Sequence, residues 1–225
     1  MKLALFDLDN TLLAGDSDYE WARFLVSRGI VDGPSYEARN DYFYTEYKAG
    51  TLDIAAFLEF QLTPLAQHSM RQLRDWHAEF MRESVLPMIT PAARQLVARH
   101  AGAGDLCAVI TATNAFVTAP IAAELGVPHL IATQPEVRDG RYTGRWVGTP
   151  CFQRGKIVCL EQWLESRGQR WADFEQSWFY SDSRNDLPLL ERVSAPVAVD
   201  PDDTLRAAAA ERGWPVISLR GPAPP

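Results

Sequence analysis

Short apolar runs alternate with helical patterns over much of the chain, and the first run lies close to the N-terminus. Residues 3–6 are all apolar, which is typical of a strand buried on both faces of a parallel sheet. Similar runs, which predict further strands, lie at 106–110, 130–132, 178–180, 196–199 and 216–219. Patterns with helical spacing lie between them, at 91–100, 115–125, 153–167 and 202–212. The alternation predicts an α/β fold whose Rossmann-like core is a parallel sheet with helices on both faces.

A long stretch, about 14–88, interrupts this alternation. It carries aromatic residues at helical spacing, for example Trp21 and Phe24, and no strand pattern falls within it. We therefore predict about four helices, inserted after the first strand as a helical-bundle cap domain of residues 14–88. The catalytic core domain then consists of residues 1–13 and 89–225.

A small hairpin is predicted in the second half of the chain. Residues 135–138 and 141–147 have strand character and flank Asp139-Gly140. This dipeptide favours the tight turn that joins two antiparallel strands, because both of its residues tolerate a positive φ. The predicted core therefore carries one antiparallel element besides its parallel sheet.

The composition is that of an ordinary globular protein, and its acidic balance limits the expected partners. The 225 residues carry a formal net charge of -7, with a pI near 5.1. Nucleic acids and anionic membranes are bound by concentrated basic patches, so neither is an expected partner. A small anionic substrate is compatible with this charge, because a metal ion and a few local cations can reverse the field inside a cleft.

The number of cysteines and the lack of long apolar runs indicate in which cellular compartment the protein is expected. Cys107, Cys151 and Cys159 are an odd number of cysteines, and none belongs to a CxxC pair. We expect reduced thiols in a cytoplasmic protein, without a structural disulfide or a zinc site. No apolar run approaches the roughly 18 residues of a membrane span, and Asp7 and Asp9 interrupt the apolar start before a signal-peptide core is complete.

Acidic residues directly follow two of the predicted strands. Asp7 and Asp9 come after the first strand with one residue between them. Carboxylates this close repel each other unless a cation, a proton or solvent compensates. Asp182 and Asp186 lie four residues apart after the strand at 178–180. Their oxygen atoms are suitable ligands for a hard cation at the sheet edge where α/β folds bind substrates.

Two further polar residues lie at positions that suit the binding of an anion. Thr111 follows the strand at 106–110, so its hydroxyl is expected in the same crevice. Asn114 either donates to a ligand there or caps the next helix. Lys156 falls in the first turn of the helix at 153–167, where a cation opposes the helix dipole unless an anion lies nearby. Taken singly, these residues are equally explained as a polar strand end and a solvated lysine.

The segment Asp7-Leu8-Asp9-Asn10-Thr11 resembles the first motif, DxDxT, of the haloacid dehalogenase superfamily of phosphohydrolases. Thr111 resembles its second motif, a Thr or Ser that hydrogen-bonds the phosphoryl group, and Lys156 its third, a lysine that pairs with the nucleophile and the phosphate. Residues 181–186 resemble the fourth motif, GDxxxD or GDGxND, with serines in place of the glycines. The four motifs occur in the family's order, so the resemblance covers the whole core.

This resemblance implies a mechanism. Asp7 would attack phosphorus and form an aspartyl-phosphate, while Asp9 would donate a proton to the leaving oxygen and later take one from water. Mg²⁺ would be held by Asp7, the backbone carbonyl of Asp9 and Asp182, with Asp186 as outer support or as a ligand through water. The presence of Asp9 favours a phosphatase or phosphomutase over the family's cation-pumping ATPases and dehalogenases.

The resemblance also suggests the substrate class. The inserted cap resembles that of the phosphoserine phosphatase branch. The amino-acid sequence of residues 180–190 is closer to that of relatives assigned as histidinol-phosphate phosphatases. The best prediction is a small phosphorylated metabolite, an amino-alcohol phosphate such as histidinol phosphate, with phosphoserine as the alternative. Both substrates carry an ammonium group. Candidate acids for that ammonium lie at the junction of core and cap and are Asp16, Asp18 and Glu20. Together with Asn114, the polar residue Arg39 is a further candidate for substrate contact.

Two other classes of function compete with a phosphatase. One is a phosphate-ester binding or regulatory protein without turnover, which would not need to preserve both a nucleophile and a separate acid. The other is a scaffold in which the acidic loops bind Ca²⁺ structurally. The sequence leaves open whether the chain is a monomer or a homodimer.

Overall fold

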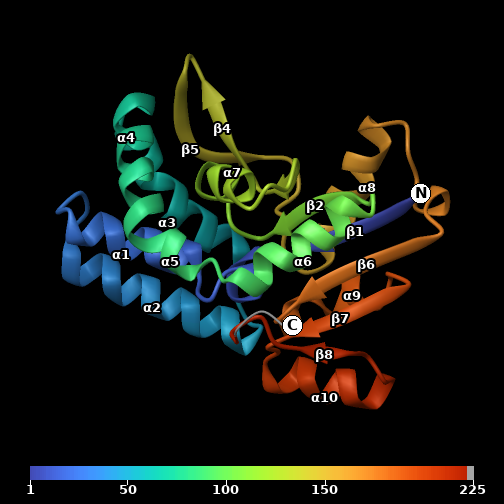
Figure 1. Cartoon of the computed structure of the whole chain (residues 1–225). Helices are drawn as coiled ribbons and strands as arrows, with labels where there is room; N and C mark the ends of the chain where they lie inside the picture. Colours follow the sequence, from blue (N-terminus) through green and yellow to red (C-terminus); the bar gives the residue numbers. More distant parts are fainter. Residues whose placement is uncertain (222–225) are drawn as a thin grey trace.

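The computed structural model describes residues 1–221 (Figure 1). The end of the predicted core domain, residues 222–225, lies outside the described residues. A six-stranded parallel sheet with the order β3-β2-β1-β6-β7-β8 forms the centre of the fold. Its strands are β1 (Lys2–Phe6), β2 (Leu106–Thr111), β3 (His129–Ala132), β6 (Gln176–Ser181), β7 (Ala195–Val199) and β8 (Val216–Ile217). The predicted parallel sheet is therefore confirmed, with the first strand at its centre.

Helices cover both faces of this sheet, and the side chains of β1 show why. Ala4 and Phe6 belong to an apolar cluster that includes side chains of α6 and α7, whereas Leu3 and Leu5 join a second cluster with α8, α9 and α10. Successive side chains of a strand point to opposite faces, so an all-apolar strand needs a helical layer on each side. These helices are α6 (Pro91–Gly102), α7 (Ala115–Glu124), α8 (Arg154–Ser166), α9 (Leu187–Leu190) and α10 (Asp203–Arg212).

The stretch between β1 and β2 is helical, as predicted. It contains α1 (Ser17–Ser27), α2 (Gly33–Ala49), α3 (Ile54–Gln67), α4 (Met70–Phe80), a further helical turn (Met81–Val85) and α5 (Leu86–Met88). Trp21 and Phe80 share one continuous apolar cluster with the core residues around α7. Phe43 and Phe60 form a separate cluster with Phe152, which precedes α8. The division into a cap domain and a core domain stays a prediction, since apolar packing is continuous across the proposed boundary.

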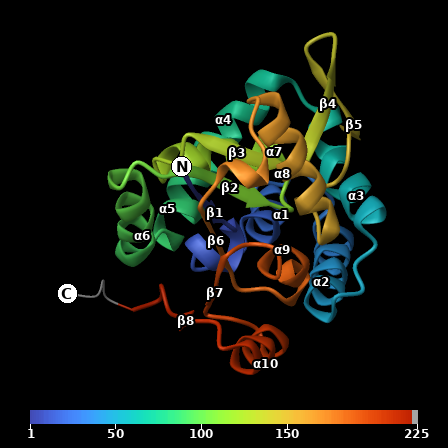
Figure 2. The same cartoon turned by 90° about the vertical axis from the view of Figure 1, so that its right-hand side faces the viewer.

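The hairpin is also present and consists of β4 (Gln134–Arg138) and β5 (Arg141–Val147). Its turn residues Asp139 and Gly140 have φ values of 50° and 71°, as the tight turn requires. The hairpin extends beyond the sheet and packs on α3 (Figure 2). Gly144 lies at this contact and has a φ of 80°, a left-handed conformation that favours glycine.

The last strand is shorter than the predicted 216–219. The backbone N–H of Leu219 donates to Asp200 Oδ2 at 2.9 Å, and its carbonyl accepts from the hydroxyl of Thr90 at 2.8 Å. Both backbone groups of Leu219 are thus satisfied by side chains, and the strand ends at Ile217. Within residues 1–221, no helix combines the length and the apolar character needed to cross a bilayer.

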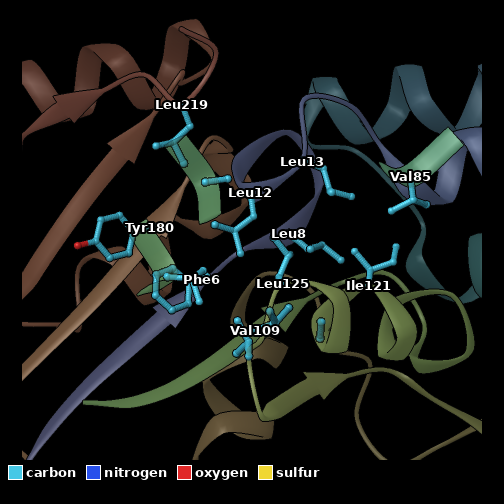
Figure 3. Close-up of a cluster of buried hydrophobic side chains, with 14 of the residues drawn as sticks. Phe6, Leu8, Leu12, Leu13, Val85, Val109, Ile121, Leu125, Tyr180 and Leu219 are labelled. Carbon is cyan, nitrogen blue, oxygen red and sulfur yellow. The ribbon is translucent and has the colours of Figure 1, made fainter. Parts of the chain in front are cut away.

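The loop that follows β1 is fixed by apolar packing. Leu8, Leu12 and Leu13 are fully buried and lie among core side chains such as Ile121 and Val109 (Figure 3). Burying a leucine side chain contributes roughly 1.5–3 kcal/mol. The polar residues between these leucines are therefore held in defined positions by their apolar neighbours.

Candidate active site

A turn at residues 8–12, whose backbone is non-helical at Asp9 and Asn10, carries the first acidic motif. Asn10 has a φ of 55°, a left-handed conformation that asparagine tolerates better than most residues. The backbone N–H of Leu13 donates to the carbonyl of Leu8 at 2.9 Å and closes the turn. From the far end of the chain, the guanidinium of Arg220 donates to the carbonyls of Asn10 and Thr11. The role of Arg220 was not evident from the sequence.

A buried lysine lies between two carboxylates. Lys156 Nζ donates to Asp7 Oδ1 at 2.7 Å and to Asp186 Oδ2 at 2.7 Å. Burial lowers the pKa of Lys156, but the charges of Asp186 and Asp7 outweigh this effect, so that its pKa lies above the ordinary value. Burial raises the pKa of Asp7 to about 7, although the charge of Lys156 acts in the opposite direction. Lys156 therefore stays charged beside the residue that is expected to be the nucleophile.

The position of Lys156 depends on a glycine. Gly155 precedes it in the first turn of α8, and a Cβ atom on Gly155 would lie 2.1 Å from the carbonyl oxygen of Pro150. No side chain fits in that space, so only glycine lets the helix begin here.

Thr11 connects the two acidic loops. Its hydroxyl donates to Asp182 Oδ1 at 2.9 Å and lies 3.3 Å from Asp7 Oδ2, while the backbone N–H of Asp182 donates to the same hydroxyl at 3.0 Å. Burial raises the pKa of Asp182 well above its ordinary value, and the charge of Asp7 adds to the effect. A buried and a half-buried carboxylate thus lie close together and repel each other, as ligands of a divalent cation would.

The hydrogen-bond partners of Asp9 differ from those of Asp7. The backbone N–H of Ser17, in the first turn of α1, donates to Asp9 Oδ1 at 2.6 Å, and the hydroxyl of Thr113 donates to Asp9 Oδ2 at 2.8 Å. Burial raises the pKa of Asp9, while these hydrogen bonds lower it. The role of Thr113 was missed, because its partner lies 104 positions earlier in the chain. Asp9 is therefore held by Ser17 and Thr113, in surroundings that favour a protonated carboxyl group.

The two polar residues predicted after β2 differ in their surroundings. Thr111 is buried and lines the same pocket as Asp7 and Asp9, and its Oγ1 accepts a hydrogen bond from the N–H of Thr113 at 3.2 Å. The side chain of Asn114 instead accepts from the N–H of Val117 and caps α7. Of the two roles considered for Asn114, the structure shows the helix cap.

The pocket lies where the core meets the helical insertion and contains about 540 Å³ of empty space, its opening to solvent included. Acidic residues of the core and of α1 line one part of it, together with Thr111 and Thr113. Side chains of α2 and α3 and of the segment between them line the rest, and most are apolar or aromatic: Asn40, Phe43, Tyr44, Tyr47, Leu52, Ile54, Phe57 and Gln61.

The candidate substrate-binding residues of the insertion separate into two groups. Asp16 lines the pocket, as does Asp18, and burial raises the pKa of Asp16 to about 7. Glu20 instead forms an ion pair with Arg23 at 3.1 Å near the surface. The guanidinium of Arg39 lies over the ring of Phe60, 5.1 Å from its centre, outside the residues that line the pocket. The structure therefore brings neither Glu20 nor Arg39 to the predicted site.

The four aspartates that the sequence predicts as metal ligands do not converge on one point. In the described part of the chain, no group of three or more His, Cys, Asp or Glu side chains is arranged to hold a metal ion. Asp186 Oδ2 instead accepts hydrogen bonds from Lys156 Nζ and from the hydroxyl of Ser181, each at 2.7 Å. A site made of two carboxylates and a backbone carbonyl needs no third acidic side chain, and Asp7 with Asp182 fits that description.

A parallel sheet with carboxylates at the ends of two neighbouring strands and a buried lysine between them is a candidate active site of an enzyme with an α/β fold. Comparison with known proteins identifies the family. Residues 4–191 match the family model of haloacid dehalogenase-like hydrolases, and the chain belongs to this family. The predicted family, the fold class and the enzyme class, a phosphatase of this family, are confirmed.

Individual relatives agree with this assignment. The chain is 49% identical over 220 residues to the histidinol-phosphatase of Neisseria meningitidis serogroup C (strain 8013). The alignment covers 97% of this chain and 99% of the relative. A crystal structure of a protein with unknown function from Bordetella pertussis Tohama I is 53% identical, with a TM-score of 0.92 over 97% of this chain and 98% of that one. A phosphoserine phosphatase with a phospho-aspartyl intermediate analogue shares the fold at 19% identity, with a TM-score of 0.69 over 98% and 94% of the two chains.

Proposed function

We propose that the chain is a Mg²⁺-dependent phosphomonoesterase that hydrolyses a small amino-alcohol phosphate through an aspartyl-phosphate on Asp7. The buried contact between Lys156 and Asp7 supports this role for Asp7. The charge of the lysine favours the ionised carboxylate and can neutralise phosphoryl oxygens that approach it. Thr111 lines the same pocket and can donate its hydroxyl hydrogen to a phosphoryl oxygen.

Asp9 is suited to move protons. Its raised pKa lets it begin protonated and donate to the oxygen of the leaving alcohol. The resulting carboxylate can then take a proton from the water that attacks the aspartyl-phosphate. The hydrogen bonds from Ser17 and Thr113 orient the carboxyl group in both states, because each donor can also stabilise the charged form.

The residues present fit a magnesium ion. Asp7 is buried and Asp182 half-buried, and a divalent cation would offset their mutual repulsion; with the backbone carbonyl of Asp9 they would hold it. When bound, Mg²⁺ polarises the phosphoryl group and keeps the nucleophile ionised. Asp186 serves this site indirectly, through the orientation of Lys156.

The charge of the pocket walls supports an amino alcohol as the substrate. Asp16 and Asp18 line the pocket, and within residues 1–221 no lysine or arginine does so. An ammonium group would favour the ionised form of these acids and pair with them, whereas the carboxylate of phosphoserine would meet acidic side chains and no cation there. This observation favours histidinol phosphate, which has an ammonium but no carboxylate, over phosphoserine. The Neisseria relative, a histidinol-phosphatase by name, points to the same substrate.

A substrate comparison tests the proposal. With Mg²⁺ present, we expect the highest kcat/KM for histidinol phosphate, a much lower value for O-phosphoserine, and measurable turnover of p-nitrophenyl phosphate. Asp16→Asn should raise KM for histidinol phosphate more than for p-nitrophenyl phosphate, while Glu20→Gln, a surface control, should change neither. Equal kcat/KM for histidinol phosphate and O-phosphoserine would contradict the proposed substrate.

The same assay separates a phosphatase from the two other classes. A phosphate-ester binding protein would bind these compounds without turnover. A calcium scaffold would gain thermal stability from Ca²⁺ and hydrolyse nothing. In the proposed enzyme Ca²⁺ should inhibit, because its looser and higher coordination disturbs the in-line geometry. A cytoplasmic location and the choice between monomer and homodimer stay predictions.

A further inference from the structure

Two buried polar side chains that line the pocket have atoms without a partner. Gln61 of α3 is 1% exposed, and both its amide nitrogen and its amide oxygen lack a hydrogen bond. Asp18 of α1 is 6% exposed, and its Oδ1 lacks one as well. Buried polar groups are nearly always paired in folded proteins, because leaving them unpaired costs stability. A glutamine whose whole amide group is unpaired beside a pocket indicates a ligand that pairs with it.

The walls around these two residues are flat and largely apolar. Phe57 precedes Gln61 by one helical turn on α3, so both side chains lie on the same face of that helix. Phe43 and Tyr44 of α2 line the same pocket, together with Ile54. Aromatic walls accommodate a flat ring better than a branched or charged group. The polar atoms of Gln61 and Asp18 are then the groups that can orient such a ring.

We propose that Gln61 and Asp18 form a subsite for a flat nitrogen heterocycle, such as an imidazole, carried by the alcohol part of the substrate. The ring N–H donates to the carboxylate of Asp18, and the other ring nitrogen accepts from the amide of Gln61. The inference rests on the proposed function and deepens it, because it assigns the recognition of the leaving alcohol to two residues of the helical insertion, on α1 and α3.

The charge state of Asp18 depends on the partner that it meets. Burial raises the pKa of Asp18 well above its ordinary value, and the charge of Asp16 raises it further. An N–H donor or a cation beside Asp18 would favour the ionised form and thus be bound more strongly than an apolar group. An aliphatic alcohol would leave both Gln61 and Asp18 unpaired.

The test compares two amino-alcohol phosphates that differ in the ring. Histidinol phosphate carries an imidazole, and phosphoethanolamine does not. For Gln61→Leu we expect kcat/KM for histidinol phosphate to fall about 10- to 100-fold, mainly through KM, while the value for phosphoethanolamine stays within about 2-fold. Asp18→Asn should also lower kcat/KM more for histidinol phosphate than for phosphoethanolamine, whose ammonium group can still meet Asp16 in the pocket wall. Gln67→Leu, at an exposed position of the same helix, is the control and should change neither substrate.

A stability measurement separates substrate recognition from a structural role. Replacing the unpaired amide of Gln61 by leucine should leave the melting temperature of the free protein equal or higher, because a buried polar group without a partner is removed. A lower melting temperature together with equal losses on both esters would show that Gln61 only supports the fold. Unchanged kinetics on histidinol phosphate in both variants would also overturn the proposal.

Binding of the free alcohol distinguishes failure of this inference from failure of the proposed function. If the wild-type protein turns over none of the esters with Mg²⁺, the proposed function is wrong. The subsite is then judged by histidinol itself, without phosphate or metal. Histidinol should raise the melting temperature of the wild-type protein and of Gln67→Leu, but not that of Gln61→Leu. Equal shifts in all three proteins, or no shift in any, would contradict the subsite.

Discussion

The hydroxyl of Thr11 lies 2.9 Å from Asp182 Oδ1, although the two residues are 171 positions apart in the chain. The contact exists because β1 and β6 are paired neighbours in the sheet, so the loops that follow them leave the same edge side by side. Thr11 thereby fixes the spacing between the two carboxylates that are proposed to hold the metal ion.

We expect Thr11→Val to weaken this connection while it preserves the shape of the side chain. The N–H and the carboxylate of Asp182 would each lose a partner, at a cost of about 1–3 kcal/mol in the free energy of unfolding. The Mg²⁺ concentration for half-maximal activity should rise. Thr11→Ser keeps the hydroxyl and should retain most of both properties. Urea unfolding and a Mg²⁺ activation curve measure the two effects, and wild-type values for the valine variant would disprove the role of Thr11.

Gly155→Ala should disturb the start of α8 and displace Lys156. The new Cβ would meet the carbonyl oxygen of Pro150 at 2.1 Å, so the backbone must move. We expect a loss of roughly 1–3 kcal/mol in stability and a marked fall in kcat. Gly102→Ala is the matched control, because a Cβ there meets nothing within 4 Å. This control should be neutral or slightly more stable, and equal behaviour of the two variants would count against the argument.

The metal-free protein should become less stable as the pH rises through the titration of Asp16. Burial raises the pKa of Asp16 from 3.8 to about 7, so between these values the folded chain holds a proton that the unfolded chain has lost. The contribution of Asp16 to the free energy of unfolding is therefore fully present below about pH 4 and is lost as the pH rises through about 7. Asp16→Asn keeps a capping side chain for α1 but cannot titrate. Urea unfolding across this range should show a flatter pH dependence for the variant, and identical slopes would refute the assignment.

Arg220 is expected to hold the loop of the first motif from outside the site. Its guanidinium donates to the carbonyls of Asn10 and Thr11. For Arg220→Gln we expect a loss of about 1 kcal/mol, a several-fold fall in kcat and faster hydrogen exchange in residues 8–13. Arg212→Gln, which breaks a surface ion pair with Glu191, is the control. Unchanged exchange in the loop of the Arg220 variant would rule out this positioning role.

The sheet, the helical insertion and the hairpin could be predicted because each leaves a local pattern in the sequence. The same holds for Asp7, Asp182 and Lys156, which lie at strand ends or at a helix start, and parallel strands bring such positions to one edge. The sequence does not reveal Gln61 or Thr113, because their significance depends on side chains that only tertiary packing brings near.

Helix geometry explains why one predicted acid lies outside the pocket. Asp18 and Glu20 are two residues apart on α1, and such residues do not share a helix face. Asp18 therefore faces the pocket, and Glu20 pairs with Arg23 near the surface. A cluster of acids in the sequence cannot show which member faces inward until the rotation of the helix about its axis is known.

The most direct test of the account is a search for the aspartyl-phosphate on Asp7. In Asp9→Asn the first step should still proceed with p-nitrophenyl phosphate, whose leaving group needs no proton, whereas activation of water for the second step is lost. Rapid mixing with Mg²⁺ should therefore give a burst of nitrophenolate equal to the enzyme concentration, and mass spectrometry should find a phosphoryl group on Asp7. The double variant with Asp7→Asn should give neither. A phosphoryl group on another residue, or a burst that persists without Asp7, would contradict the central claim.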